Sequence, residues 1–318
     1  MMYSRTMDQI HIQEVGMRDG LQSAGQFVET EDKVRLLNSL SKTGLSKIEV
    51  TSFVSPKAVP LLADAEAVLT AIDRQVGVSY SALIPNIRGL DRALSVELDE
   101  VNVVMSVSEV HNIANLRMTC DESLAQFHEI CRNRGSLKVN GTLATAFGCP
   151  FTGPVEESTV LDWAKRYQDV GIDSLTLADT IGSATPNQIF ELCGAMVEAF
   201  PGVEITLHLH NTRGLGIANA LSGVSAGIRR LDASIGGIGG CPYAPGATGN
   251  VCTEDLVHAL IFDGYQCAVD LDRLVAVSHD LESVLSEPLP GLIRQAGSKL
   301  TTHPMSDDLK CRLGLVSQ

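Results

Sequence analysis

The sequence predicts an α/β protein with the fold of a (β/α)8 TIM barrel and additional C-terminal helices. Strand and helix patterns alternate along the chain, and eight such pairs fit between residues 10 and 262. Strict alternation implies a parallel sheet, and a barrel of this kind typically needs about 250 residues, which the 318 residues provide. Hydrophobic residues make up 44% of the chain and aromatic residues only 4%, which suits buried parallel strands. A doubly wound open sheet is the alternative that the alternation leaves open.

The predicted elements follow one another in short, regular intervals. Apolar runs bounded by turn residues predict strands at residues 10–15, 47–53, 77–84, 100–107, 137–146, 174–178, 203–209 and 230–235. Helical spacing predicts helices at residues 31–42, 59–72, 86–94, 121–134, 155–170, 186–200, 215–227, 252–262 and 271–285. Thr30 is a candidate N-cap of the first helix, and a polar loop is expected directly after residue 107. We expect residues 1–270 to form the barrel domain and residues 271–318 a helical extension packed on it.

Charge and cysteine usage exclude several classes of partner. The net charge is −14 and no run of Lys and Arg occurs, which argues against a nucleic acid or an anionic membrane surface as partner. No apolar run approaches the roughly 20 residues of a membrane span, and no secretory leader is recognised at the N-terminus. The eight cysteines contain no CxxC pair. We therefore expect a cytoplasmic protein with reduced thiols.

Two histidines close the seventh predicted strand and are the first candidates for chemistry. His208 and His210 are two residues apart, so both point to the same side of an extended chain. Two imidazoles at a strand end can form half of a metal site, whereas ordinary strand-end histidines with hydrogen-bond partners are the alternative. In a TIM barrel the active site lies at the carboxyl ends of the strands, so both histidines are expected there.

Other polar residues are expected at the same face of the barrel. Asp19 and Asn250 would add oxygen ligands to the two histidines, a mixed set that suits Mg2+ or Mn2+ and admits Zn2+. The alternatives are a turn residue for Asp19 and a helix N-cap for Asn250. Further polar residues of the predicted strand ends and of the loop over residues 236–250 are Arg18, Gln22, Glu49, Ser52, Asp179 and Cys241.

Arg18 and Glu49 could equally form a buried ion pair that supports the site. Residues 236–250 contain six glycines, a composition typical of a loop that closes over a ligand. A cysteine in such a loop meets the ligand when the loop shuts, and an inert thiol is the alternative for Cys241.

The chain closely resembles the 3-hydroxy-3-methylglutaryl-CoA lyases, a group of metal-dependent barrel enzymes that share an Asp-Arg-Glu trio. The resemblance runs from Glu14 to Val257 and rests on the strings EVGMRDGLQ, KIEVTSFVSPKAVP, GCPF, LADTIG, HLHNTRG and GGCPYAPGATGNVCTEDLV. The last string carries the cysteine-bearing loop that distinguishes these lyases from related condensing synthases. Those synthases also usually have a long C-terminal regulatory region, which this chain is too short to hold.

The resemblance implies roles for individual residues. Asp19, His208, His210 and Asn250 match the family's metal ligands. Arg18 matches the arginine that stabilises the enolate, and Glu49 matches its acidic support. Cys241 matches the catalytic loop cysteine, and Asp179 matches an aspartate of the site. Ser52 matches a hydroxyl near the acyl group of the substrate. The substrate implied is a CoA thioester, and a homo-oligomer (dimer or tetramer) is expected.

Departures from the family pattern affect the acyl specificity. The family usually reads HDTYG where this chain reads HNTRG, so Arg213 is a candidate contact to a substrate carboxylate. Gly25 stands where a lysine is frequent, Thr176 where serine is common, and residues 144–146 read Ala-Thr-Ala. Gln22, Ser52, Thr176 and Arg213 are the candidate substrate-binding residues.

Three alternatives stay open: cleavage of citramalyl-CoA or longer-branched analogues, condensation of acetyl-CoA with a 2-keto acid, and a catalytically silent barrel.

Overall fold

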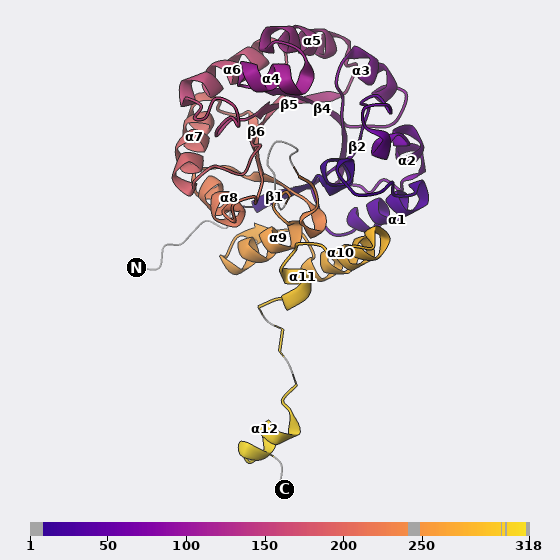
Figure 1. Ribbon diagram of the computed structural model, residues 1–318, viewed down its shortest axis with the longest axis vertical. Coiled ribbons are helices and arrows are strands. Elements are labelled where there is room, and N and C mark those ends of the chain that lie inside the picture. The colour runs from indigo at the N-terminus through magenta and orange to yellow at the C-terminus, as the bar shows by residue number, and fades with distance from the viewer. Residues whose placement is uncertain (1–8, 241–248, 300, 303, 316–318) are drawn as a thin grey trace.

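The computed structural model describes residues 9–240, 249–299, 301–302 and 304–315, and its centre is a closed barrel of parallel strands (Figure 1). Each strand pairs in parallel with the next, and β1 pairs with both β8 and β2, which closes the ring. The fold prediction is therefore confirmed, and the open-sheet alternative is wrong. The strands are β1 (Gln9–Glu14), β2 (Lys47–Ser52), β3 (Ser79–Leu83), β4 (Glu100–Ser106), β5 (Lys138–Ala144), β6 (Ser174–Asp179), β7 (Glu204–Leu209) and β8 (Arg230–Ala233).

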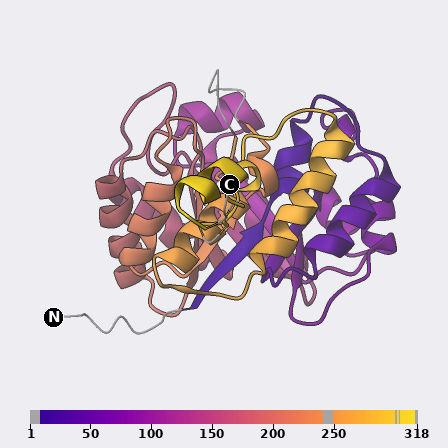
Figure 2. The same cartoon turned by 90° about the horizontal axis from the view of Figure 1, so that it is seen from below.

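Helices surround the barrel on all sides (Figure 1). They are α1 (Thr30–Leu40), α2 (Ala65–Ala71), α3 (Ile87–Ala93), α4 (Glu109–Leu116), α5 (Cys120–Asn133), α6 (Glu157–Asp169), α7 (Pro186–Ala199), α8 (Gly216–Ser225), α9 (Thr253–Phe262), α10 (Leu271–Leu285), α11 (Ile293–Ala296) and α12 (Asp307–Arg312). Figures 1 and 2 show α10 beside α1 and close to α9, so it completes the outer ring. A two-residue strand, β9 (Gln266–Cys267), adds to β1 below the barrel.

The apolar core lies between the strands and the helices. Outward-facing strand residues such as Ile48, Val101 and Leu175 are fully buried there, and Leu37 and Leu40 of α1 pack into the same layer. The outward-facing strand residues are apolar because a helix covers the outer face of the barrel.

Capping boxes define the start of two of the helices. Thr119 caps α5 together with Glu122, and Thr185 caps α7 together with Gln188.

Local predictions differ from the structure at three places. The expected polar loop after residue 107 contains α4, which buries the polar side chains of His111 and Asn112. The helix predicted over residues 59–72 is a 3-10 turn, Pro60–Leu62, followed by α2. Thr30 does not cap α1: Glu29 occupies the N-cap position, and the Thr30 hydroxyl donates instead to Asp64 Oδ2 at 2.8 Å. Tertiary contacts determine these three differences, and such contacts cannot be predicted from local sequence patterns.

No helix in the described part of the chain is long and apolar enough to cross a membrane.

Candidate active site

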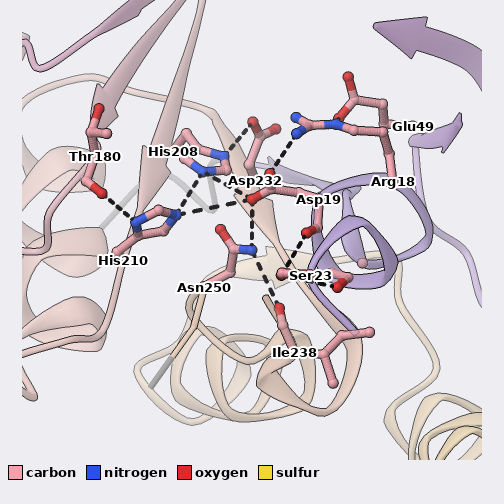
Figure 3. A network of polar contacts seen from close by, with 12 residues as sticks. Arg18, Asp19, Ser23, Glu49, Thr180, His208, His210, Asp232, Ile238 and Asn250 are labelled. Atoms are coloured by element: carbon pink, nitrogen blue, oxygen red, sulfur yellow. Dashed lines mark hydrogen bonds and ion pairs between the residues drawn. The ribbon is translucent and has the colours of Figure 1, made fainter. Parts of the chain in front are cut away.

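His208 in β7 and His210, directly after the strand, point into a cavity at the carboxyl end of the barrel (Figure 3). His208 and His210 lie on the same side of the strand, and their Nε2 atoms are 3.4 Å apart. Oδ2 of Asp19 is 3.9 Å from Nε2 of His208 and 4.0 Å from Nε2 of His210. The three side chains could therefore hold one metal ion between them.

Asp19 is brought to the histidines by a short π-helix, Gly16–Gly20, that follows β1 directly. A wide helical turn of this type is frequent at functional sites because it redirects side chains. Gly16 at its start allows a close approach: a Cβ atom there would lie 2.7 Å from Oε1 of Glu14. This π-helix is thus the element that aims Asp19 into the barrel.

The second ring nitrogen of each histidine is held by the protein. Nδ1 of His208 lies 3.1 Å from Oδ2 of Asp232, and Nδ1 of His210 lies 2.6 Å from the carbonyl oxygen of Thr180 (Figure 3). Hydrogen bonds of this kind fix the tautomer and the ring orientation of metal-binding histidines. Both Nε2 atoms are therefore left to face Asp19.

Asn250 completes the set from the end of the Gly-rich loop. Its Nδ2 donates to Asp19 Oδ2 at 2.9 Å and to the Ile238 carbonyl at 3.3 Å, while its Oδ1 is buried without a partner. A buried amide oxygen without a partner, beside a carboxylate and two imidazoles, fits the donor preferences of a divalent cation. The N-cap alternative for Asn250 is wrong, because α9 begins at Thr253 with Cys252 as its N-cap.

Arg18 bridges this ligand set to Glu49 on β2. Its Nε donates to Glu49 Oε2 and its Nη1 to Asp19 Oδ1, both at 2.5 Å, and Asn102 Nδ2 donates to the other Glu49 oxygen at 2.6 Å. Burial alone would raise the pKa of Asp19, but Arg18 and the two histidines outweigh it and hold that pKa well below its usual range. Asp19 is therefore ionised, as a metal ligand must be.

Two further buried carboxylates, those of Glu14 and Glu254, support the Gly-rich loop beneath the site. Glu14 accepts hydrogen bonds from the Gly16 and Ile235 amides and from the Thr253 hydroxyl, at 2.7, 2.9 and 2.7 Å. Burial raises the pKa of Glu14 to about 8 despite these bonds. Glu254 accepts from the Gly236 amide at 2.9 Å. Both ends of the loop are thus anchored to buried acids, whereas Cys241 itself lies outside the described residues.

Two of the other predicted site residues, Gln22 and Thr176, line the cavity. The Thr176 hydroxyl oxygen accepts a hydrogen bond from Asn140 Nδ2 at 3.0 Å. Ser52 is buried, and its hydroxyl oxygen accepts from the Val54 amide at 3.2 Å.

Asp179 and Arg213 support the loop after β6. Asp179 is buried and accepts from the Ser183 and Ala184 amides at 2.9 and 3.0 Å. Arg213 is exposed and donates to the Ile181 and Gly182 carbonyls at 2.7 and 3.1 Å. These contacts engage the carboxylate of Asp179, predicted as an aspartate of the site, and the guanidinium of Arg213, predicted to contact a substrate carboxylate.

Asp232 and Asn102 are site residues that the sequence patterns did not single out. Both lie within strands, and each bonds a predicted site residue on another strand. Asp232 lies in the string RLDAS. The signal that could have identified it as a site residue is a carboxylate inside a short buried strand.

Fold and site together define an enzyme of the TIM-barrel class with a candidate divalent-metal centre at the carboxyl ends of its strands. The family model described as HMGL-like matches residues 9–281. The chain belongs to this family and is a lyase of the hydroxymethylglutaryl-CoA lyase type.

The individual relatives include lyases of two CoA thioesters. A hydroxymethylglutaryl-CoA lyase of Bacillus subtilis is 42% identical over 88% of this chain and 95% of its own length. An (R)-citramalyl-CoA lyase of Chloroflexus aurantiacus is 39% identical over 92% of this chain and 96% of its own length. A solved HMG-CoA lyase from Acinetobacter baumannii, in complex with coenzyme A and 3-methylmalate, has a TM-score of 0.91 and 44% identity, covering 95% of this chain and all of that one.

Proposed function

We propose that the protein cleaves 3-hydroxy-3-methylglutaryl-CoA to acetyl-CoA and acetoacetate with the help of Mg2+ or Mn2+. The observation that carries the proposal is the joint placement of Asp19, His208 and His210 beside the Arg18–Glu49 pair. The similarity to hydroxymethylglutaryl-CoA lyases at 42% identity over most of the chain supports the same reaction.

Asp19, His208, His210 and Asn250 would hold the ion, which supplies Lewis acidity that lowers the pKa of the substrate hydroxyl. Asp19 or His208 takes the hydroxyl proton, and the electron pair of that O–H bond forms the new ketone. The carbon–carbon bond next to it breaks, and its electrons pass to the thioester as an enolate. Arg18 stabilises the enolate oxygen with the guanidinium N–H groups that Glu49 and Asp19 do not use.

The enolate carbon must then gain a proton to give acetyl-CoA. Cys241 is the candidate donor, because Gly240, the residue directly before it, lines the cavity. Glu49 serves as a positioning residue, since it touches Arg18 and Asn102.

Citramalyl-CoA is a second candidate substrate, supported by the Chloroflexus relative at 39% identity. Its cleavage yields pyruvate in place of acetoacetate. Arg213 does not favour either substrate, because its guanidinium is engaged with backbone carbonyls of the loop after β6. Gln22 and Thr176 border the cavity and are proposed as the substrate contacts.

The deciding experiment incubates the purified protein and Mg2+ or Mn2+ with both thioesters and identifies the keto acid released. Acetoacetate supports the first candidate and pyruvate the second. Release of free CoA from acetyl-CoA and a keto acid would support a condensing synthase, and lack of any turnover a silent barrel. We also propose a homo-oligomer, a dimer or tetramer, located in the cytoplasm, which light scattering and fractionation would test.

A further inference from the structure

The interior of this barrel is polar, whereas the layers inside a TIM barrel are usually filled by branched apolar side chains. The strand register places side chains of alternate strands in common layers. One layer beneath the metal-ligand set contains Glu49, Asn102, Thr176 and Asp232. The next layer down contains Gln13, Ser81, Asn140 and Thr206.

Hydrogen bonds within these layers confirm that the side chains face inward. Asn102 on β4 donates to Glu49 on β2 at 2.6 Å, and Gln13 on β1 donates to Thr206 on β7 at 3.3 Å. Each bond skips one strand, which is possible only across the interior of the barrel. The polar residues therefore do not belong to the apolar layer between strands and helices.

Two polar atoms in this interior lack partners. Oγ of Ser81 and Oδ1 of Asn102 are buried, and neither atom has a hydrogen-bond partner. The amide of Asn102 is oriented by Glu49, so its oxygen is turned away from that carboxylate. Buried polar groups are nearly always paired, so these two atoms indicate space for a polar group that is not part of the chain.

The same region is continuous with the candidate active site. One cavity of about 510 Å³ is bordered both by Asp19, His208 and His210 and by Ser81 and Asn102. This volume lies within the range of about 300–1,000 Å³ that is typical of small-molecule sites. A substrate held at the metal-ligand set can therefore extend a branch into the polar interior.

We propose that Ser81 and Asn102 form a subsite for a hydroxyl group on the C3 branch of the thioester. This proposal rests on the proposed function. Asn102 Oδ1 is an acceptor only, whereas the Ser81 hydroxyl can donate. One substrate hydroxyl can satisfy both atoms, donating to Asn102 and accepting from Ser81. An apolar branch leaves both atoms unpaired, and a carboxylate there would face Asn102 Oδ1 and Glu49. The enzyme therefore selects short, hydroxylated C3 branches over apolar branches of equal size.

The test compares three thioesters that differ only in the C3 branch: methyl, ethyl and hydroxymethyl. Ethyl and hydroxymethyl have the same number of heavy atoms, so their kcat/KM ratio reports the hydroxyl alone. A site that pairs a substrate hydroxyl discriminates strongly against the analogue that lacks it. We expect the wild-type enzyme to prefer the hydroxymethyl branch by about 100-fold, and Ser81→Ala to reduce that preference about tenfold.

Two further variants separate a specific effect from a structural one. Ser81→Cys keeps the size of the side chain but donates weakly, so it should also reduce the preference. Ser41→Ala removes a buried serine outside the barrel, where Ser41 bonds Leu37 and Tyr80, and should leave the ratio at the wild-type value.

A wild-type ratio near one, or a ratio that neither Ser81 variant changes, would overturn the subsite while methyl-branch cleavage still supports the proposed function. Cleavage of none of the three thioesters overturns the proposed function and this inference with it.

Discussion

Nδ1 of His208 lies 3.1 Å from Oδ2 of Asp232, so a carboxylate on β8 determines how a histidine on β7 presents its other nitrogen. Asp232 also borders the cavity, and its carboxylate holds this ring nitrogen in place. The orientation of His208, a candidate metal ligand, therefore depends on a residue outside the candidate ligand set.

Asp232→Asn should weaken metal binding by roughly 10- to 100-fold, because the amide cannot hold the His208 ring as the carboxylate does. Titration calorimetry with Mn2+ measures the change directly. Asp173→Asn is the matched control, since Asp173 bonds Arg134 on the outside of the barrel. Equal Mn2+ affinity in the wild type and Asp232→Asn would show that the ring needs no such support.

Arg18→Met should reduce cleavage by roughly 100- to 1,000-fold, because it removes the donor proposed for the enolate oxygen. The loss should fall mainly on kcat, since the enolate charge appears only in the reaction. Glu49→Gln should show a smaller loss, because Arg18 keeps its bond to Asp19. Steady-state kinetics with circular dichroism on each variant checks both statements, and a loss confined to KM would contradict the assignment.

Removal of divalent metal by a chelator should abolish cleavage and lower the melting temperature, and Mg2+ or Mn2+ should restore both. An ion at 100 times its Kd stabilises the folded state by about 2.7 kcal/mol. Asp19→Ala should melt at the same temperature with and without added metal. A full response of Asp19→Ala to Mn2+ would place the ion elsewhere.

The architecture was predictable because it depends on periodicity, which local sequence contains. The convergence of Asp19, His208, His210 and Asn250 was predictable for a related reason: strand ends in a barrel meet on one face. Asp232 and Asn102 were not, since their importance depends on a partner on another strand. The hydrogen bonds of Arg213 were not predictable either, because the carbonyls that bind its guanidinium belong to a loop distant in sequence.

Gly249→Ala should destabilise the protein far more than Gly77→Ala, although both glycines have positive φ angles, of 83° and 89°. A Cβ at Gly249 would lie 2.4 Å from the Gly237 carbonyl oxygen, whereas a Cβ at Gly77 meets nothing within 4 Å. Backbone strain alone costs about 1–2 kcal/mol, and overlap with backbone atoms adds to it. Chemical denaturation should show a loss of about 3 kcal/mol or more for Gly249→Ala, and equal losses would mean that the loop end relaxes freely.

Glu14 should make the stability of the protein depend on pH. Burial raises its pKa from the ordinary value of 4.5 to about 8, so the folded protein retains this proton over a range in which the unfolded chain releases it. The contribution of Glu14 is therefore complete below pH 4.5 and is lost as the pH rises toward 8. Glu14→Gln stays neutral throughout and should lose less stability than the wild type between pH 5 and pH 8. Melting temperatures of both proteins across that range test the difference, and parallel curves would mean that Glu14 is ionised in the folded state.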